Sequence, residues 1–264
     1  MSTNTVNIVP KPAGFLRDLF TVAGRALRAI PREPEAVIPA LMIPLFFFIV
    51  NVGSLSEASK FAGVVDFKAF QLPVAIVFAV TGISRANALV TDIKSGYFDR
   101  LLISPVRRSA LLLGLMVADF ALVIALSIPV VLLGAILGIK FVTGAVGIIA
   151  FLLISGLWGL AFTGFPYAIA LKTGSPAAVN SSFLLFFPFS FLTTSFLPME
   201  ALSGWLKAIA KFNPVTYLLD GLRSLIYVGW DSMILGKTML AIGIILFLSF
   251  GMALLALKGR VSRR

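Results

Sequence analysis

The sequence predicts an all-α integral membrane protein, and three observations support this fold class. Hydrophobic residues make up 59% of the 264 residues, more than the core of a soluble domain of this size can bury. They form long unbroken blocks rather than alternating patterns, which favours helices over a closed β-barrel as the way to satisfy the backbone in lipid. Charged residues make up only 12% of the chain and gather between the blocks.

Six apolar blocks in one transmembrane domain are predicted to be spans, since about 20 residues cross the hydrocarbon core. The first block is short and contains Pro39 and Pro44, and a polar loop at residues 53–69 follows it. Tight turns are expected before and after the fourth span. The six predicted spans are residues 36–52, 70–90, 110–139, 145–171, 177–197 and 238–257.

An amphipathic helix is predicted before the first span, at residues 14–30. Its apolar residues lie near one stripe and its arginines lie mostly elsewhere, as in helices that lie in the membrane interface. There the arginines would reach lipid headgroups; an ordinary solvated helix is the alternative. The stripe contains Phe15, Leu19, Val22, Ala26 and Ile30, and the basic residues are Arg17, Arg25 and Arg28.

Lysine and arginine outnumber acidic residues by 22 to 11, which gives a net charge of +11. Because these residues flank apolar blocks, membrane topology and anionic lipid headgroups explain them better than nucleic acid, which we do not expect as a partner. Placing both chain ends, Arg85, residues 91–109 and Lys172 on one side gathers 15 of the 22 basic residues there. Basic residues favour the cytoplasmic side, so both ends are predicted to be cytoplasmic in a protein of the cell membrane.

Cysteine and histidine are absent, which excludes disulfides, thiolate metal sites and imidazole bases. We expect no catalytic residue and no metal site. Gly236-Lys237-Thr238 imitates the end of a phosphate-binding loop, but Asp231 stands where that pattern requires glycine. Any ATP used by this protein would therefore be hydrolysed by another chain.

The polar segment at residues 91–109 is longer than a connection between two spans needs. It contains a stretch that predicts a short amphipathic helix ending before Pro105, GYFDRLLISPVRRS. Its composition supports equally a docking surface for a protein partner and a plain interfacial helix. The side chains expected to face the bilayer or the bundle are Tyr97, Leu101 and Leu102, and those expected to face water or a partner are Asp99, Arg100, Arg107 and Arg108.

Two amphipathic helices are predicted within residues 198–237. The first carries Trp205 on its apolar side, and the second begins at Asn213-Pro214, a capping residue followed by proline at the first helical position. Asp220 and Arg223 of the second helix are spaced to pair at i, i+3. We interpret the two helices as a hairpin that enters the outer leaflet and caps the bundle.

Two ionisable residues lie within predicted spans: Arg85 near the end of the second, and Asp119 about 15 Å deep in the third. A carboxylate at that depth is costly unless it is paired, protonated or facing water. It could be a polar contact on a substrate path or an internal hydrogen bond between two helices. We favour the hydrogen bond, with Asn180, Ser181 or Ser182 of the fifth span as partners, because a lone acid makes a poor proton relay.

Three groups of residues form a pattern that is more specific in its order and spacing than any single member. They are Arg32, Pro34, Pro39 and Pro44; then Asp92, Gly96, Arg100, Leu101, Leu102, Ser104, Pro105, Arg108, Gly114 and Asp119; then Leu197, Pro198, Trp205, Pro214, Asp220 and Arg223. Over nearly the whole chain this pattern resembles the membrane subunits of type-2 ATP-binding cassette exporters, in particular the daunorubicin-resistance permease group. Lys94-Ser95 depart from it, since the family often has an acidic residue there.

The resemblance implies a connecting helix at residues 14–30 and outer gate helices at 198–230, with Trp205, Pro214, Asp220 and Arg223. It implies two six-span subunits, identical or paralogous, and two cytoplasmic ATPase subunits that hold ATP and Mg²⁺. The cargo would be an amphipathic drug, lipid or lipid-linked molecule. Residues 97–105 would dock into a groove of the ATPase, and the coupling residues would be Tyr97, Phe98, Asp99, Arg100, Leu101, Leu102, Ser104 and Pro105.

Two other classes of protein fit the sequence less well. A membrane-embedded enzyme such as a lipid-headgroup transferase would need clustered acidic residues or histidines near a leaflet boundary, and the chain has neither. A secondary transporter or channel would show inverted repeats or several intramembrane ionisable residues. Only Arg85 and Asp119 are found and no convincing repeat, so this second class is kept as the alternative.

Overall fold

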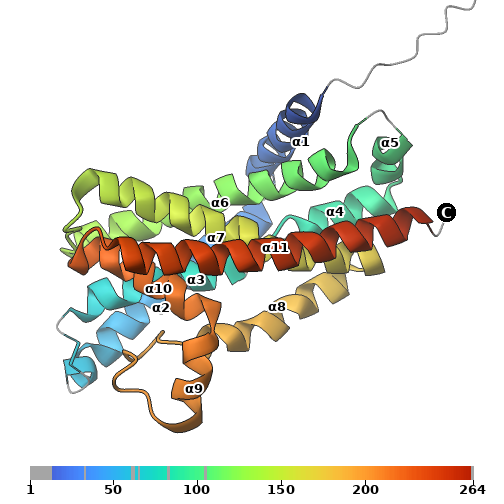
Figure 1. Ribbon diagram of the computed structural model, residues 1–264. Helices are drawn as coiled ribbons and strands as arrows, with labels where there is room; N and C mark the ends of the chain where they lie inside the picture. Colours follow the sequence, from blue (N-terminus) through green and yellow to red (C-terminus); the bar gives the residue numbers. More distant parts are fainter. Residues whose placement is uncertain are drawn as a thin grey trace, which may run out of the picture.

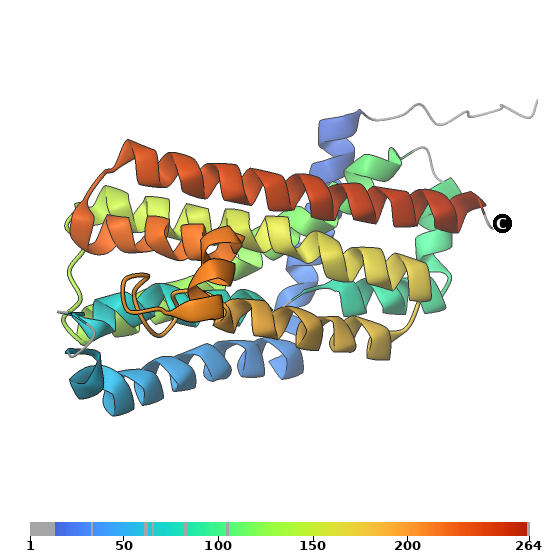
Figure 2. The same ribbon diagram turned by 60° about the horizontal axis from the view of Figure 1, so that its bottom comes forward.

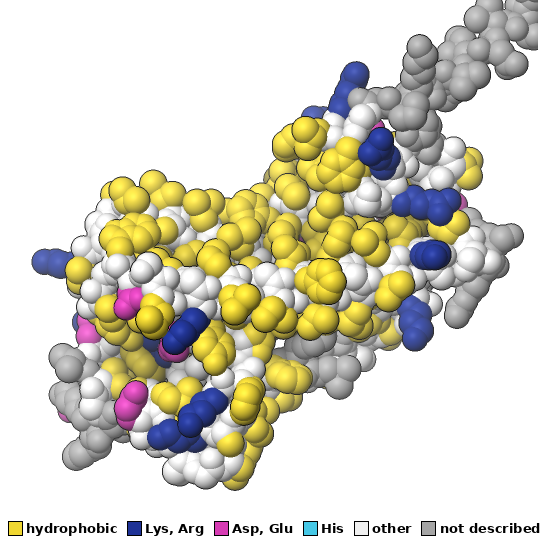
Figure 3. All heavy atoms as spheres, viewed as in Figure 1, with side chains coloured by type: hydrophobic (Ala, Val, Ile, Leu, Met, Phe, Trp, Pro, Cys, Tyr) yellow, Lys and Arg dark blue, Asp and Glu magenta, His cyan; other side chains and the backbone are white. Residues whose placement is uncertain are grey.

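The computed structural model of the protein describes residues 14–32, 34–60, 63–64, 66–81, 84–103 and 106–262. Within these residues the regular structure is entirely helical, which confirms the predicted all-α class. The long helices run side by side as one bundle (Figures 1 and 2). On the face shown in Figure 3, hydrophobic side chains cover the middle of this bundle and charged side chains gather toward its two ends.

Four helices of the described part are long and apolar enough to cross a membrane. Two further apolar helices are shorter and occupy the places of the second and fifth predicted spans, so the six-span arrangement stays a prediction. The four long helices are α2 (Pro34–Lys60), α6 (Arg108–Ile136), α7 (Gly144–Thr173) and α11 (Ser232–Ser262), and the two shorter ones are α3 (Phe67–Thr81) and α8 (Pro176–Phe191).

The second predicted span, residues 70–90, is not one continuous helix. α3 covers its first part, and a separate helix, α4 (Ala86–Lys94), covers its end. The first N–H groups of a helix lack partners within that helix. Here the Arg85 N–H, just before α4, donates to Asp119 Oδ1 at 3.1 Å. A buried carboxylate of α6 thus allows a new helix to start inside the bundle.

The fifth predicted span, residues 177–197, is also shorter than expected, because residues 192–197 follow α8 without helical structure. The last carbonyl groups of a helix need partners from outside it. Two of them, on Phe189 and Leu192, accept hydrogen bonds from Asn213 Nδ2 at 2.8 and 2.9 Å. The side chain of Asn213 therefore stabilises the C-terminal end of α8, which lies earlier in the chain than the sequence predicts.

Two other helices are longer than the spans predicted for them. α2 continues through the first part of the loop expected at residues 53–69. α11 begins at Ser232 rather than at residue 238, because Asp231 caps it. The Asp231 Oδ1 atom accepts the N–H groups of Met233 and Ile234 at 2.8 and 2.9 Å, as expected of an aspartate at a helix start.

Short helices distinguish the two halves of the bundle. α1 (Phe15–Ala29), α4 and α5 (Tyr97–Ile103) lie in the half that holds the C-terminus, and α1 runs across the long helices in both views (Figures 1 and 2). α9 (Gly204–Phe212) and α10 (Pro214–Arg223) lie in the other half (Figure 1). A 3₁₀ turn (Ile30–Arg32) follows α1, and a π-helical turn (Ser224–Val228) follows α10.

Candidate functional site

The helix α5 is held at the end of the bundle by one buried aromatic side chain. Ser95 and Gly96 turn the chain between α4 and α5, and Gly96 has φ +73°, a conformation that favours glycine. Phe98 is only 1% exposed. It packs in a hydrophobic cluster with buried residues of α4, α6, α7 and α11, including Leu89, Leu112, Leu171 and Leu257.

The opposite side of α5 is open to solvent or to a partner. Arg100 is exposed, and Ile103, which the sequence pattern did not single out, is 88% exposed. Leu101 and Leu102 are half-buried and pack against the cluster around Phe98. Asp99 was expected to face outward but is half-buried, like Tyr97. Of the predicted coupling residues, Ser104 and Pro105 lie outside the described residues.

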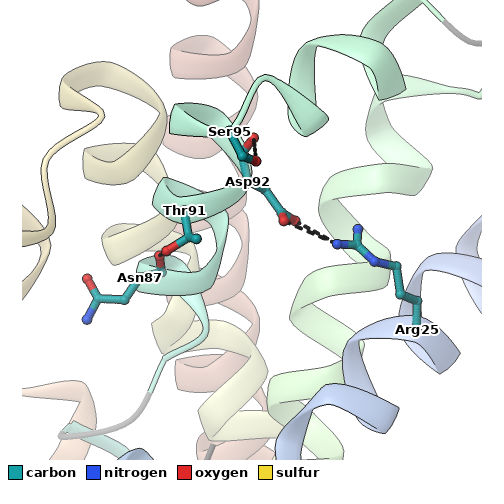
Figure 4. Close-up of polar contacts among 5 residues, drawn as sticks. All are labelled: Arg25, Asn87, Thr91, Asp92 and Ser95. Atoms are coloured by element: carbon teal, nitrogen blue, oxygen red, sulfur yellow. Dashed lines mark hydrogen bonds and ion pairs between the residues drawn. The ribbon is translucent and has the colours of Figure 1, made fainter. Parts of the chain in front are cut away.

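Arg25 of α1 connects three helices at this end. Its Nη2 atom lies 3.1 Å from Asp92 Oδ1 of α4 (Figure 4), and its guanidinium carbon lies 3.9 Å from the ring centroid of Tyr97 of α5. We expected Arg25 to reach lipid headgroups, and the structure instead places it in contact with protein. The reason is that the turn at Gly96 brings Asp92 and Tyr97 to the same side of the α4–α5 pair.

A buried acid provides a second contact between α1 and the segment around α5. Asp18 is 6% exposed, and its Oδ2 atom accepts the N–H of Arg107 at 3.3 Å, just before α6 begins. Gly114 of α6 lies against Val22 of α1. α1 therefore contacts the chain both before and after α5, which makes α1, α5 and the start of α6 one structural unit.

The apolar stripe predicted on α1 faces protein rather than lipid. Ala26 is buried and Val22 packs on α6. Leu16 and Phe20, which lie outside that stripe, are 65% and 66% exposed. Exposed Arg17 and Arg28 flank them, so these side chains retain the arrangement expected for contact with a membrane interface.

A cavity of about 300 Å³ lies between α1, α4 and α6 and has both apolar and polar lining residues. Arg25, Arg85, Asn87 and Asp92 contribute to its lining. Asn180, predicted as an intramembrane partner of Asp119, lies on α8 and instead accepts a hydrogen bond from Asn87 Nδ2 at 2.8 Å. The Asp119 side chain is fully buried and does not line this cavity. Its Oδ1 atom accepts the Arg85 N–H and so connects α6 to the start of α4.

The opposite half contains a buried arginine with a different set of partners. Arg223 of α10 is 3% exposed and stacks on Phe70, with 3.5 Å between its guanidinium carbon and the ring centroid. Its Nε donates to Phe70 O at 3.2 Å, and its Nη atoms donate to Oγ1 and O of Thr194 at 3.0 and 2.8 Å. Gln71 Nε2 donates to Ser195 O at 2.9 Å. These two side chains therefore supply donors to the carbonyl groups of Thr194 and Ser195, within the non-helical residues 192–197.

The predicted Asp220–Arg223 pair is not among the ion pairs of the described residues, since Arg223 is directed to carbonyl groups and Asp220 is exposed. Both residues line a small cavity of about 270 Å³ between α10 and α11. Pro214 is the first residue of α10, after the Asn213 cap, whose Oδ1 accepts the Val215 N–H at 3.0 Å. Trp205 of α9 is largely exposed.

Comparison with known proteins adds independent findings. The profile of a family described as ABC-2 type transporter matches residues 17–227. The daunorubicin resistance ABC transporter permease protein DrrB1 of Streptomyces coeruleorubidus is 25% identical over 83% of this chain and 78% of its own length. The probable doxorubicin resistance ABC transporter permease protein DrrC of Mycobacterium tuberculosis is 23% identical over 79% and 76%. The putative transport permease ycf38 of Cyanophora paradoxa is 27% identical over 80% and 74%.

Proposed function

Since this chain belongs to the ABC-2 type transporter family, we propose that it is the membrane-spanning permease subunit of an exporter driven by a separate ATPase subunit. The observation that carries this proposal is the construction of α5. One side chain, Phe98, is buried in the bundle, whereas Arg100 and Ile103 are exposed at the end of the molecule. A partner that contacts the exposed side can displace the helix, and Phe98 transmits that displacement to the bundle.

The contacts around α5 indicate which helices would move when a partner displaces α5. Phe98 packs against residues of α4, α6, α7 and α11. Arg25 and Asp18 connect the same region to α1, which packs on α6. Packed interiors move as units rather than deforming continuously. A displacement of α5 would therefore move α1 and the start of α6 together, and the free energy would come from ATP and Mg²⁺ bound to the partner.

The remaining parts of the proposal concern assembly and cargo. A second membrane subunit, identical or paralogous, would complete the pathway in the cell membrane, with both chain ends in the cytoplasm. Two relatives are described as daunorubicin or doxorubicin resistance proteins, which supports an amphipathic drug or lipid as the cargo.

The test is transport by proteoliposomes with and without the partner. The chain would be co-expressed with candidate ATPases, purified, and assayed for export of a fluorescent anthracycline. We expect one ATPase to co-purify and transport to require both proteins and ATP. Transport by the chain alone would overturn the proposal and favour a secondary transporter or channel.

A charge reversal at α5 tests the coupling itself. Arg100→Glu should reduce ATP-driven transport about tenfold or more while the protein inserts and folds normally, because Arg100 is exposed and like charges at an interface cost several kcal/mol, about 1.4 kcal/mol corresponding to each tenfold. The matched control is Lys211→Glu, an exposed charge reversal on α9 in the other half. Equal transport by the two variants would contradict the assigned role of α5.

A further inference from the structure

A groove between α7 and α11 has features of a lipid site. The two helices approach closely at their middle, where Ser249 Oγ donates to Ala161 O and a Cβ on Gly164 would lie 2.6 Å from Ser249. Toward the α5 end they enclose a groove of about 690 Å³. Small residues on both helices, Ala168 and Ala256 among them, leave this space open.

One end of the groove carries positive charge, and no acidic residue of the lining neutralises it. Lys172 and Arg260 lie where the two helices end. One Nη of Arg260 donates to Leu171 O at 3.3 Å, but its Nε is buried with no hydrogen-bond partner among the described residues. Lys172 is exposed beside it. This end therefore suits a negatively charged group.

The length of the groove matches one leaflet. Its lining on α11 extends from Met252 to Arg260, which corresponds to about 12 Å at 1.5 Å per residue. Half of the hydrocarbon core is about 15 Å thick. The apolar walls formed by Leu171, Met252 and Leu255 could therefore cover most of one acyl chain, with its headgroup phosphate near Lys172 and Arg260.

We propose that this groove binds one acyl chain of an anionic phospholipid from the leaflet on the α5 side. The apolar walls and the two cations at one end together select an anionic amphiphile, because the walls alone would accept any acyl chain and the cations alone any soluble anion. The site does not depend on the proposed function, since binding can be measured on the purified chain without an ATPase.

Native mass spectrometry of the full-length protein in detergent tests the site. The probes are dioleoyl phosphatidylglycerol, dioleoyl phosphatidylcholine and soluble glycerol 3-phosphate. Each basic residue near a membrane surface contributes about fivefold to anionic lipid affinity, so with two such residues the anionic lipid should bind about 25-fold more tightly than the zwitterionic one. Lys172→Gln with Arg260→Gln should abolish this preference, and Ala256→Phe should prevent binding of both lipids. Glycerol 3-phosphate should not bind.

Matched variants separate binding in the groove from a general attraction of anionic lipid to basic residues. Lys207→Gln with Lys211→Gln, on α9 in the other half, should leave the preference unchanged. Because Arg260 also contacts Leu171 O, Lys172→Gln alone is included; it should reduce the preference about fivefold without changing thermal stability. Equal binding of both lipids, unchanged preference in the Lys172 and Arg260 double variant, or tight binding of glycerol 3-phosphate would each overturn the proposal.

One further outcome would assign the groove to a second copy of the chain. The protein has no cysteine, so Leu255→Cys introduces a single thiol at an exposed position beside the groove. Efficient disulfide formation between two copies in membranes would mean that protein, not lipid, covers this face. We expect no such cross-link.

Discussion

The two halves of the molecule each use an arginine to connect distant segments, but in opposite ways. Arg25, in the α5 half, is partly exposed and contacts a carboxylate, Asp92, and the ring of Tyr97. Arg223, in the α10 half, is buried and contacts carbonyl groups of Phe70 and Thr194. An exposed ion pair contributes little to the free energy of unfolding and can break and form again easily. Removing a buried hydrogen-bonding group costs more, because its buried partners are left without a hydrogen bond.

This difference suits the role proposed for α5 and the structural needs of the non-helical residues 192–197. A helix that receives a push needs a firm apolar anchor and polar contacts that can rearrange, and α5 has both in Phe98 and Arg25. A segment without helical structure inside an apolar bundle needs permanent partners for its backbone. Within residues 192–197, three carbonyl groups accept hydrogen bonds from the side chains of Gln71, Asn213 and Arg223. The following variants test this contrast.

The largest expected effect is at the apolar anchor of α5. Phe98→Ala should lower the free energy of unfolding by about 4 kcal/mol, because it leaves a cavity in a cluster where Phe98 is 1% exposed. Denaturant titration in detergent measures the loss, and Phe98→Leu is the matched control with a smaller cavity. A change below about 1 kcal/mol would mean that α5 is not anchored by this side chain.

The buried arginine should be the next most sensitive position. Arg223→Met keeps the apolar volume but leaves the carbonyl groups of Phe70 and Thr194 without donors, which should cost about 2–3 kcal/mol in the same assay. Asp220→Asn, which changes an exposed residue of the same helix, should change stability by about 0.5 kcal/mol or less. Equal losses of stability in Arg223→Met and Asp220→Asn would mean that Arg223 acts mainly through a pair with Asp220 rather than through the carbonyl groups.

Asn213 allows two functions of one side chain to be separated. Asn213→Ala removes the cap of α10 and the donor to Phe189 O and Leu192 O, so we expect a loss of about 2 kcal/mol. Asn213→Ser keeps a capping oxygen for the Val215 N–H and removes the amide donor without adding a buried charge, so its loss should be about half as large. A loss in Asn213→Ser equal to that in Asn213→Ala would place all of the contribution in the donor.

The exposed contacts of Arg25 should give the smallest effect on stability. Arg25→Gln should cost about 0.5–1 kcal/mol at low salt, from the pair with Asp92 and the contact with Tyr97, and less at high salt. Arg28→Gln, an exposed change one turn away on α1, is the control. A loss above about 2 kcal/mol would mean that Arg25 contributes as much to stability as the buried Arg223, and the contrast between the two halves would be wrong.

Local signals in the sequence were sufficient for several features. The capping of α10 by Asn213 before Pro214 was readable from the two residue types. Asp231 offered the same kind of signal for α11, but the length of the apolar block placed the start later. Phe98 was selected only through the family resemblance, because periodicity in a seven-residue helix does not distinguish one inward aromatic from its neighbours.

Other assignments failed because they applied a local rule to a long-range choice. The i, i+3 spacing predicted that Arg223 would pair with Asp220, yet its partners include Phe70, 153 residues away. The amphipathic pattern of α1 predicts lipid headgroups within reach of Arg25, and the structure shows Asp92, 67 residues away, as its ionic partner. In both cases the competing partner becomes visible only when the helices are packed together.

Composition and block length were enough to identify helices that require lipid as their solvent, because these properties depend on side chains near one another in the chain. The separate start of α4 and the end of α8 before residues 192–197 were not predictable in that way, since the groups that stabilise these helix ends, Asp119 and Asn213, come from distant segments of the chain. Backbone groups in an apolar interior must find partners, and which partners are near is a property of the packed bundle.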